Sequence, residues 1–590
     1  MLTFSSLTTW DKGYNIGMKF GELALYLKKL EKTPSRLSIT EILSDLFKKS
    51  SSNEVDKTTY LVLGQLAPAY EGIVFNMADK MVIKAIAKSY GKQNMEVVDL
   101  YKKLGDLGEV AEWLAKEKGS KSDSNLMVSD VYNTLLGIAN DSGKDSVERK
   151  VEKLAKLFSS LDPLSVRFVA RIPLGKLRLG FSDKTVLDGI SWMLKGNKSL
   201  KTKLEKAYQV LPDVGSLVKR VKQKGIEKAT KHVVPITGAP VLPMLAQRIK
   251  SPNEMIEKMG QVAVEPKLDG LRLSLHFKRG KGGFVKAFTR NLNDNSWMFP
   301  ELNQIGDCVN GDEVILDCEA VGLNEETKQL ANFQSTMTRR RKHEIEDTLK
   351  KVGITFFVFD ILSLNGKNLM EDSYIERRKI LEKTLKEGKN FKIVKNEFTK
   401  DPKKIDELYK KEFMEGYEGI IVKKADATYV PGRTGWRWVK MKQGKTEESK
   451  LADTIDAVVM GYSFGKGKRS GFGVGQFLVG VRQNNSFLTT SKVGTGLTDE
   501  QFREIKERLK KLEVKNKPKE YEAHKNYTPD YWVEPSLVVE IAADEITKSP
   551  THSAGLALRF PRLINFRDDK TPEQATTLRE LEGLFNLQER

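Results

Sequence analysis

The N-terminal part of the chain has the hydrophobic spacing of amphipathic helices. One helical face carries apolar side chains, with Lys28 and Lys29 on the opposite side; the apolar positions are Phe20, Leu23, Leu27 and Leu30. Similar stripes occur in 101–118 and 151–161, and alternating runs of Val, Ile and Thr are scarce. The pattern predicts an all-α domain over residues 1–232.

A short glycine-containing segment, 105–108, interrupts this helical pattern. The favoured interpretation is a plain turn between two helices. The alternative is a helix N-terminus whose backbone N–H groups bind a phosphate.

The composition changes at 232–243, HVVPITGAPVLP, which holds three prolines and one glycine and has no helical period. We expect a linker here. Beyond it, β-rich runs alternate with helical patterns at 373–387 and 403–415; the runs are 271–277, 314–318, 355–361, 419–423 and 436–442. This alternation predicts an α/β or α+β domain over residues 240–447.

After residue 448 the apolar runs become shorter and glycines become frequent. The predicted strands are 456–461, 475–481, 487–493 and 537–541, with one helix near 499–512. Short strands of this kind are typical of a small β-barrel, which we expect over residues 448–590.

The composition indicates which kinds of partner and site are compatible with the chain. The chain has 590 residues and a net charge of +20, which favours a polyanion such as nucleic acid. On charge alone, a lysine-rich surface without such a partner explains the composition equally well. Two cysteines, Cys308 and Cys318, exclude a four-cysteine zinc site and a disulfide framework. The N-terminus lacks the pattern of a signal peptide and no apolar run could span a bilayer, so we expect an intracellular protein without membrane attachment.

The central motif is EPKLDGLR at 265–272, which matches the nucleotidyltransferase signature K-x-D-G-x-R. A four-position pattern is weak by itself, and a surface lysine beside an Asp-Gly turn would also produce it. Further motifs follow in order: TRN at 289–291, DCE at 317–319, FVFD at 357–360, EGIIVK at 418–423, WVKMK at 438–442, RFPR at 559–562 and RDDK at 567–570.

Taken together, these motifs resemble those of the ATP-dependent DNA ligases of the archaeal and eukaryotic replicative type. The resemblance extends to GDLGEVAE and PLGKLRLGFSDKTVLDGIS in the helical region and to LRFPRLINFRDDKTPEQATT near the end. It implies a helical DNA-binding domain, a nucleotidyltransferase adenylation domain and a C-terminal OB-fold. The implied activity is the sealing of nicks in double-stranded DNA in replication, repair and recombination.

Lys267 is the predicted nucleophile, which forms a covalent lysyl-AMP. A lysine has an ordinary pKa of about 10.4, so its amine must be made neutral by burial or by nearby cations. The cations expected to do this while holding the α-phosphate are Arg272, Arg290, Lys440 and Lys442. Lys440 and Lys442 lie two apart and share one face of a strand; a solvated strand face is the alternative.

The resemblance assigns further residues to the nucleotide and its metal. Glu319 and Glu418 are oxygen ligands suited to Mg²⁺ or Mn²⁺. Phe359 is expected to stack on adenine, although an isolated Phe in such a strand would be a core residue. Glu265 and Arg433 are also expected to contact the nucleotide. Many relatives have an arginine at the position of Thr434 in this chain, and we expect the neighbouring Arg433 to take over its role.

Glu418 and Lys423 are five residues apart, so a regular strand would direct them to opposite faces. Both reach one nucleotide only if Glu418 precedes the strand or Gly419 forms a bulge.

The resemblance also implies three phosphoryl transfers. Lys267 attacks ATP, the 5′-phosphate of a nick attacks the lysyl-AMP, and the 3′-hydroxyl attacks the adenylated end. The C-terminal residues expected to orient the pyrophosphate are Arg559, Arg562 and Lys570. They lie almost 300 residues after Lys267, so we expect the C-terminal domain to move on the segment 444–450.

Two other patterns carry less weight. The glycines of 461–467 resemble a P-loop, but the gap is too short and no Ser or Thr follows the lysine. The basic run 339–343 is either a solvated helix end or a phosphate contact.

Other functions fit less of the chain. An RNA ligase or a capping guanylyltransferase would share the lysine motif but not the helical region or the C-terminal ending. An NAD-dependent ligase would need the excluded zinc site, and a non-catalytic DNA-binding scaffold would not need the intact Lys267, Glu319, Glu418 and Lys442. We expect a monomer that binds nicked DNA, with a sliding clamp as a further partner by family analogy.

Overall fold

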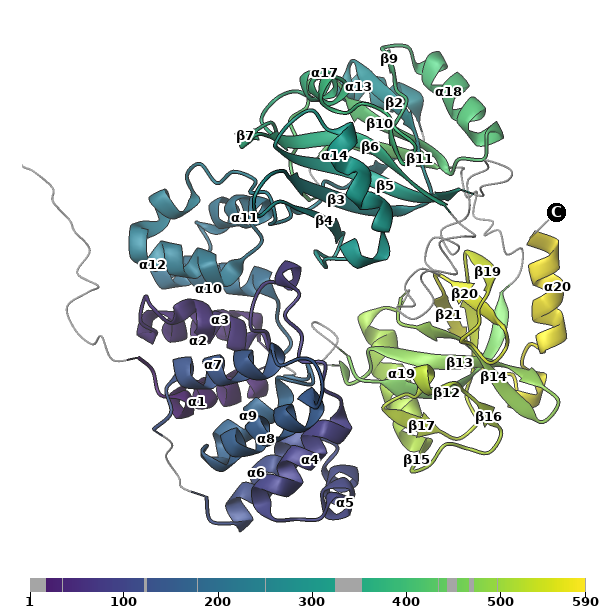
Figure 1. Ribbon diagram of the computed structural model, residues 1–590. Coiled ribbons are helices and arrows are strands. Elements are labelled where there is room, and N and C mark those ends of the chain that lie inside the picture. Colours follow the sequence, from purple (N-terminus) through teal and green to yellow (C-terminus); the bar gives the residue numbers. More distant parts are fainter. Residues whose placement is uncertain are drawn as a thin grey trace, which may run out of the picture. The chain divides into compact units, whose positions relative to one another are not determined.

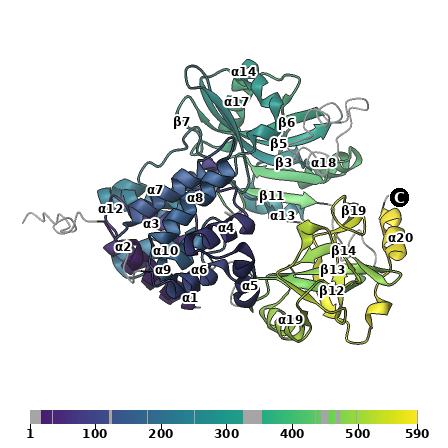
Figure 2. The ribbon, with the colours of Figure 1, turned by 60° about the horizontal axis from the view of Figure 1, so that its bottom comes forward.

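The computed structural model describes residues 17–588 except 34, 121–124, 178, 250, 324–352, 433–434, 443–453, 466–471 and 496. The chain forms two compact units (Figures 1 and 2). The first comprises Met1–Leu177 and Asp183–Gly444, and the second comprises Lys445–Arg590 together with Arg178–Ser182. The first unit contains a helical domain and a central domain of helices and strands; the second contains the C-terminal domain.

The helical domain contains the predicted amphipathic helices. They are α1 (Phe20–Lys32), α2 (Arg36–Lys49), α3 (Val55–Val62), α4 (Asp79–Tyr90), α5 (Asn94–Leu104), α6 (Leu107–Glu117), α7 (Val128–Ala139), α8 (Ser146–Ser159), α9 (Pro163–Arg171), α10 (Asp183–Lys195), α11 (Lys201–Val210) and α12 (Val214–Thr230). The predicted apolar face of α1 is at most 1% exposed. Burying such faces, rather than intrinsic propensity, provides most of the stability of helices in proteins.

The glycine-containing segment is the predicted turn between α5 and α6. Gly105 ends α5 in the left-handed conformation, with φ +70°. The Asp106 carboxylate caps α6 by accepting the Glu109 N–H at 2.9 Å, and it also accepts Arg171 Nε at 2.9 Å. A carboxylate of the chain, Asp106, therefore already occupies the N-terminus of α6, where the alternative interpretation would place a phosphate.

The central domain is built on two sheets. One has the order β4-β3-β5-β6-β7, with β8 beside β6, and the other has the order β1-β11-β10-β2-β9. The strands are β1 (Gln247–Arg248), β2 (Val262–Pro266), β3 (Leu271–Lys278), β4 (Phe284–Thr289), β5 (Glu313–Leu323), β6 (Gly353–Leu364), β7 (Lys367–Asn368), β8 (Phe391–Ile393), β9 (Glu397–Thr399), β10 (Gly419–Lys424) and β11 (Trp438–Lys442).

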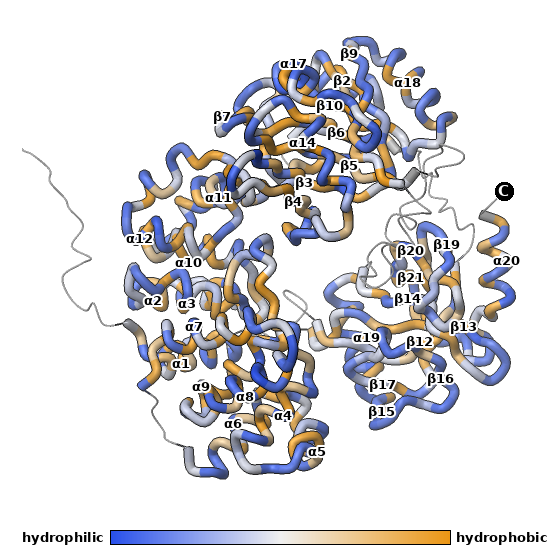
Figure 3. The backbone as a smooth tube through the Cα atoms, viewed as in Figure 1, coloured by the Kyte–Doolittle hydropathy of each residue, from blue (hydrophilic) through white to orange (hydrophobic). Residues whose placement is uncertain are grey.

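Each of these sheets has its own core, covered by helices. Against the first sheet pack α14 (Ile305–Cys308) and α17 (Tyr374–Thr384), through Ile305 and Leu381. Against the second pack α13 (Pro252–Met259) and α18 (Pro402–Met414); Figure 3 shows the largely hydrophilic residues of α18 in blue. Because β2 and β3 belong to different sheets, the segment 267–270 crosses from one sheet to the other.

The predicted linker is not a free tether. Ala239 and Val241 are buried, and the Gly238 N–H donates to His276 Nδ1 at 3.0 Å. The Leu242 N–H donates to the Gln209 carbonyl in α11 at 2.9 Å. The prolines prevent a helix here, as predicted, but the apolar residues between them pack on the central domain.

The C-terminal domain contains the four predicted strands, which are β12 (Ile455–Ser463), β13 (Gln476–Gln483), β14 (Ser486–Val493) and β18 (Val538–Ala542). It also contains short strands that were not predicted: β15 (Glu513–Val514), β16 (Tyr521–Glu522), β17 (Tyr531–Val533), β19 (Glu545–Lys548), β20 (Leu556–Arg559) and β21 (Arg562–Phe566). Among the described residues, the strands pair in the order β15-β17-β12-β13-β14-β16. In addition, β18 pairs with β12, and β21 pairs with β18. These pairings of the described strands do not close a barrel.

The prediction of a single helix in this domain was wrong. Besides α19 (Asp499–Lys511), a second helix, α20 (Leu578–Gln588), follows the last strand. Leu581 of α20 is fully buried in the core of the domain, and Leu584 and Phe585 pack against that core. This apolar spacing is visible in the sequence but was not recognised.

Candidate active site

A cavity of about 200 Å³ lies in the central domain between the two sheets. Its lining combines cationic, acidic and aromatic side chains with apolar residues, namely Leu245, Ala246, Glu265, Pro266, Lys267, Leu268, Arg272, Arg290, Glu319, Phe359, Val394, Ile421, Lys423, Trp438 and Lys440. Seven of the predicted site residues are therefore in one place: Glu265, Lys267, Arg272, Arg290, Glu319, Phe359 and Lys440.

Lys267 is held where β2 ends, beside the start of β10. Its N–H donates to the Gly419 carbonyl at 2.9 Å, and its carbonyl accepts the Glu418 N–H at 3.1 Å. Its ammonium group forms an ion pair with the Glu418 carboxylate and donates to the Leu268 carbonyl at 3.3 Å. The side chain is 19% exposed, so a ligand in the cavity can reach the amine.

Glu418 precedes β10, as one of the two predicted arrangements requires. The strand starts at Gly419, whose φ of +136° disfavours other residues. Glu418 can thus contact Lys267 while Lys423, within β10, still lines the cavity.

Glu265 and Lys423 form a buried ion pair at 2.8 Å, with side chains 3% and 1% exposed. The Tyr374 hydroxyl also donates to Glu265, and Lys423 Nζ donates to the Phe359 carbonyl at 3.0 Å. Burial lowers the pKa of Lys423 below its ordinary value, although the charge of Glu265 opposes this shift. Glu265 therefore lines the cavity with its carboxylate already engaged by the chain.

Arg272 lies opposite Glu319 in the pairing of β3 with β5. Its guanidinium donates to both oxygens of Asp317, at 3.0 and 2.6 Å. The group lies 5.4 Å from the ring centroids of both Phe359 and Trp438. Burial alone would lower the pKa of Arg272, but the charge and hydrogen bonds of Asp317, together with Tyr429 and Glu319, outweigh it and the pKa is raised, so Arg272 stays charged.

Glu319 is a carboxylate poised between its two protonation states. Burial raises its pKa to about 7, and the charges of Lys267 and Arg272 oppose that shift. A bound cation would favour the ionised form.

Two carboxylates near Lys267 are candidate ligands for Mg²⁺. Glu319 and Glu418 both interact with the Lys267 amine, so each can offer oxygen ligands near it. Throughout the described residues, no group of three or more His, Cys, Asp or Glu side chains could hold a metal ion. This set suits Mg²⁺, which usually takes one or two carboxylates together with substrate phosphates and water.

The aromatic and remaining basic residues line the rest of the cavity. Phe359 and Trp438 pack edge to face, with centroids 6.0 Å apart, so Phe359 belongs to the wall rather than to a closed core. Lys440 lines the cavity and Arg290 lies at its exposed edge. Arg433 and the side chain of Lys442 lie outside the described residues, as do 444–450, 339–343 and Lys466 of the P-loop-like segment.

The predicted C-terminal cations all pair with carboxylates of their own domain. Arg559 donates to Glu545 at 2.8 Å, Arg562 to Asp544 at 2.9 Å, and Lys570 to Asp456 at 2.5 Å. Phe560, between the two arginines, is 60% exposed and has a φ of +52°.

Several residues of the site were missed from the sequence. Trp438 stands in the sequence only as the first residue of the WVKMK motif, while Tyr374 and Tyr429 carry no motif signal at all. Asp317 belongs to the DCE motif, but nothing in the sequence indicates that it is the partner of Arg272. Each of these contacts joins segments far apart in the chain.

Comparisons with known proteins agree with this site. Residues 243–442 match the family model described as "ATP dependent DNA ligase domain", 19–191 match "DNA ligase N terminus", and 470–570 match "ATP dependent DNA ligase C terminal region". The chain belongs to the ATP-dependent DNA ligase family. Its activity is that of a DNA ligase, which fits the cavity lined by a lysine, cations and aromatic rings.

Individual relatives cover almost the whole chain. It is 40% identical over 588 residues to a "Probable DNA ligase" of Dictyoglomus thermophilum, with 97% of this chain and 98% of the relative covered. It is 36% identical over 596 residues to the "DNA ligase" of Saccharolobus solfataricus, with 97% and 98% covered. The solved structure "Pmar-Lig_PreS3" has the same fold, with a TM-score of 0.52 at 19% identity, covering 92% of this chain and 99% of that one.

In the described part of the chain, no helix combines the length and the apolar character needed to cross a bilayer.

Proposed function

We propose that the cavity binds ATP and that Lys267 is the nucleophile of the first step. The observation that carries this proposal is the placement of the Lys267 amine in the wall of a cavity that Arg272, Lys440, Phe359 and Trp438 also line. The aromatic rings suit a base, and the cations suit phosphates.

In this step the Lys267 amine attacks the α-phosphorus, an N–P bond forms, and the P–O bond to the β-phosphate breaks to release pyrophosphate. The amine must first lose a proton, and the cations around it favour its neutral form. The charge that develops on the phosphate is stabilised by Arg272, Arg290, Lys440 and Lys442. Arg433 and Glu265 complete the nucleotide contacts; Glu265 acts through its fixed position beside Lys423.

Glu319 and Glu418 would hold Mg²⁺ or Mn²⁺, which neutralises charge on the phosphates when bound. Their shared interaction with the Lys267 amine supports this assignment.

The C-terminal domain is proposed to be an OB-fold whose Arg559, Arg562 and Lys570 orient the pyrophosphate. Its short strands with buried apolar residues on both faces of β12 support this assignment. We retain the predicted boundaries 1–232, 240–447 and 448–590, and a movement on 444–450 between the ATP step and the DNA step. Equal crosslinking distances between the domains in the ATP-bound and nick-bound protein would contradict that movement.

The DNA partner is a nicked duplex, bound through its backbone by the helical domain and the basic surface. The charge of +20 supports this proposal, and affinity should fall steeply with salt concentration. We further propose a role in replication, repair and recombination by an intracellular monomer, with a sliding clamp as a partner.

The test is covalent labelling of the full chain with ATP labelled on the α-phosphate, in the presence of Mg²⁺. Wild type should carry label on a denaturing gel, and Lys267→Ala should carry none. Lys278→Ala serves as the matched control, because this β3 lysine pairs with Glu313 with a side chain 42% exposed and lies outside the cavity lining.

Addition of nicked DNA should discharge the label and seal the nick. Labelling of Lys267→Ala would contradict the assignment of the nucleophile. If nicked RNA discharges the label and nicked DNA does not, the proposed DNA substrate is contradicted.

A further inference from the structure

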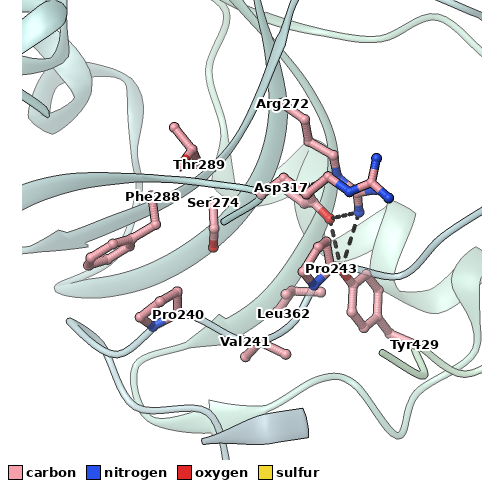
Figure 4. Close-up of a pocket in the computed structure, with 11 residues that line it drawn as sticks. Pro240, Val241, Pro243, Arg272, Ser274, Phe288, Thr289, Asp317, Leu362 and Tyr429 are labelled. Atoms are coloured by element: carbon pink, nitrogen blue, oxygen red, sulfur yellow. Dashed lines mark hydrogen bonds and ion pairs between the residues drawn. The ribbon is translucent and has the colours of Figure 1, made fainter. Parts of the chain in front are cut away.

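A second, smaller pocket lies on the other side of Arg272 from the nucleotide cavity. It lies beside the linker residues Pro240, Val241 and Pro243, and Arg272 and Arg290 line both pockets. Figure 4 shows Arg272, Asp317 and Tyr429 joined by dashed interactions in this pocket. Its free space is about 20 Å³, on the order of one water molecule, so it is a packed wall rather than a ligand site.

The Tyr429 hydroxyl is the centre of this wall. It donates to Asp317 Oδ2 at 2.9 Å, and its oxygen accepts the Met244 N–H at 3.0 Å and Arg272 Nη2 at 3.4 Å. Arg272 Nη1 also donates to the Met244 carbonyl at 2.6 Å. Tyr429 and both Met244 backbone groups thus surround the side of Arg272 that faces away from the nucleotide cavity.

Tyr429 is itself firmly placed. The residue is 3% exposed, its N–H donates to the Met370 carbonyl at 2.8 Å, and its ring packs at 90° on Trp438 with centroids 5.7 Å apart. The chain following it bonds to the end of the linker: Gly432 N–H donates to the Pro243 carbonyl at 3.0 Å, and Leu245 N–H donates to the Gly432 carbonyl at 2.8 Å.

These contacts restrict Arg272 strongly. An arginine has five N–H donors, and four bonds to Asp317, Met244 and Tyr429 are formed here. Its Cζ also lies 5.4 Å from the ring centroids of both Phe359 and Trp438. The guanidinium therefore has one orientation before any ligand arrives, which is the arrangement that a preorganised phosphate contact requires.

We propose that Tyr429 is a positioning residue of the adenylation step: its hydroxyl fixes Arg272 toward the α-phosphate through Asp317 and the Met244 backbone. This inference rests on the proposed role of Arg272. Tyr429 does not contact the substrate, and its whole effect passes through Arg272.

The test is Tyr429→Phe in the full chain, which removes the hydroxyl and keeps the ring. Single-turnover labelling of Lys267 is measured over a series of ATP concentrations. The maximal rate should fall about tenfold, because a misplaced charge acts mainly on the transition state, while half-saturating ATP should stay within about twofold. A purely structural loss would instead lower the melting temperature without this split.

Two further variants complete the experiment. Tyr132→Phe is the matched control, because this buried tyrosine donates to the Leu66 carbonyl in the helical domain, away from the cavity. It should label at the wild-type rate. In an Arg272→Lys background, Tyr429→Phe should change the rate by less than about twofold, because the two residues act as one unit.

The outcomes are separable. A wild-type maximal rate in Tyr429→Phe, or a full tenfold loss added to that of Arg272→Lys, would overturn the inference. A wild-type rate in Arg272→Lys alone would instead contradict the proposed role of Arg272. If Tyr429→Phe does not fold, Asp317→Glu tests the same network from its other end, with the same split expected between rate and half-saturating ATP.

Discussion

The cations of the central domain and those of the C-terminal domain are held in different ways. Arg272 is fixed by both oxygens of a carboxylate that is 5% exposed, by a backbone carbonyl and by a tyrosine. Arg559 and Arg562 form ion pairs with more accessible carboxylates, Glu545 and Asp544, which are 23% and 28% exposed. A buried, multiply bonded cation is preorganised, whereas a half-exposed pair can open at little cost and exchange its carboxylate for a ligand.

Asp317→Asn should have the largest effect, because it leaves the buried charge of Arg272 without its counter-ion. The free energy of unfolding of the central domain should fall by about 3–5 kcal/mol, and lysyl-AMP formation should fall with it. Denaturant unfolding measures the first quantity. Asp312→Asn is the control: its side chain is 85% exposed and 3.9 Å from Arg279, so it should cost less than about 0.5 kcal/mol. If both variants lower the free energy of unfolding equally, Arg272 is not held more firmly than the exposed ion pairs.

Arg562→Ala should show the reverse balance in the C-terminal domain, with little effect on stability and a large effect on one step. Labelling of Lys267 should slow roughly a hundredfold, because an oriented partner of the leaving group is lost. Sealing of a DNA nick that already carries AMP does not use ATP and should change by less than about twofold. Arg508→Ala is the control, since Arg508 pairs with Glu504 and Asp568 in the same domain. Equal losses in both steps would contradict a role confined to pyrophosphate.

His276 extends the comparison to pH. It is fully buried between Gly238 and Ser274, and burial lowers its pKa to about 3. Between pH 7 and 5 the unfolded chain binds a proton that the folded chain does not, so stability should fall by about 2 kcal/mol as pH decreases.

His276→Gln should lose this pH-dependent contribution, which is measured as the difference from wild type in denaturant unfolding at the two pH values. Between pH 7 and pH 8.5 the histidine is neutral in both states, so the two proteins should then change in parallel. An unchanged slope in the variant would show that His276 is not the titrating group.

Glu545→Gln should have the smallest effect, and it should be a gain. Without the charge of Glu545, that carboxylate no longer competes with pyrophosphate for Arg559, so the pyrophosphate concentration that half-reverses lysyl-AMP should fall about two- to fivefold. Glu540→Gln, beside Asn565 and Thr454 in the same domain, should leave it unchanged. Weaker binding in Glu545→Gln would show that Glu545 positions Arg559 instead of competing for it.

The motifs indicated which residues would lie together better than which residues would hold them in place. Lys267, Glu319 and Phe359, which the family resemblance assigned to one site, line one cavity. The engagement of Glu265 by Lys423 and Tyr374 could not be predicted, since it joins three segments over more than 100 residues.

The same limit applies to the fold. Hydrophobic periodicity predicted α1 and every described strand of eight or more residues, because burial of one face is a local property of the sequence. It missed α20, and it predicted the linker 232–243 without showing that part of this linker is packed. Packing of Ala239 and Val241 on the central domain is a tertiary effect, and so is the bond from Gly238 to His276.

That packed connection has a practical consequence for dividing the chain into recombinant pieces. A fragment that began at residue 244 would keep every motif of the central domain and still lack the bonds from Thr237 to Glu313 and from Gly238 to His276. Its new terminus would fall at Met244, the residue whose backbone holds both Arg272 and Tyr429. A recombinant fragment of the central domain should therefore include the segment 232–243 and begin before residue 232.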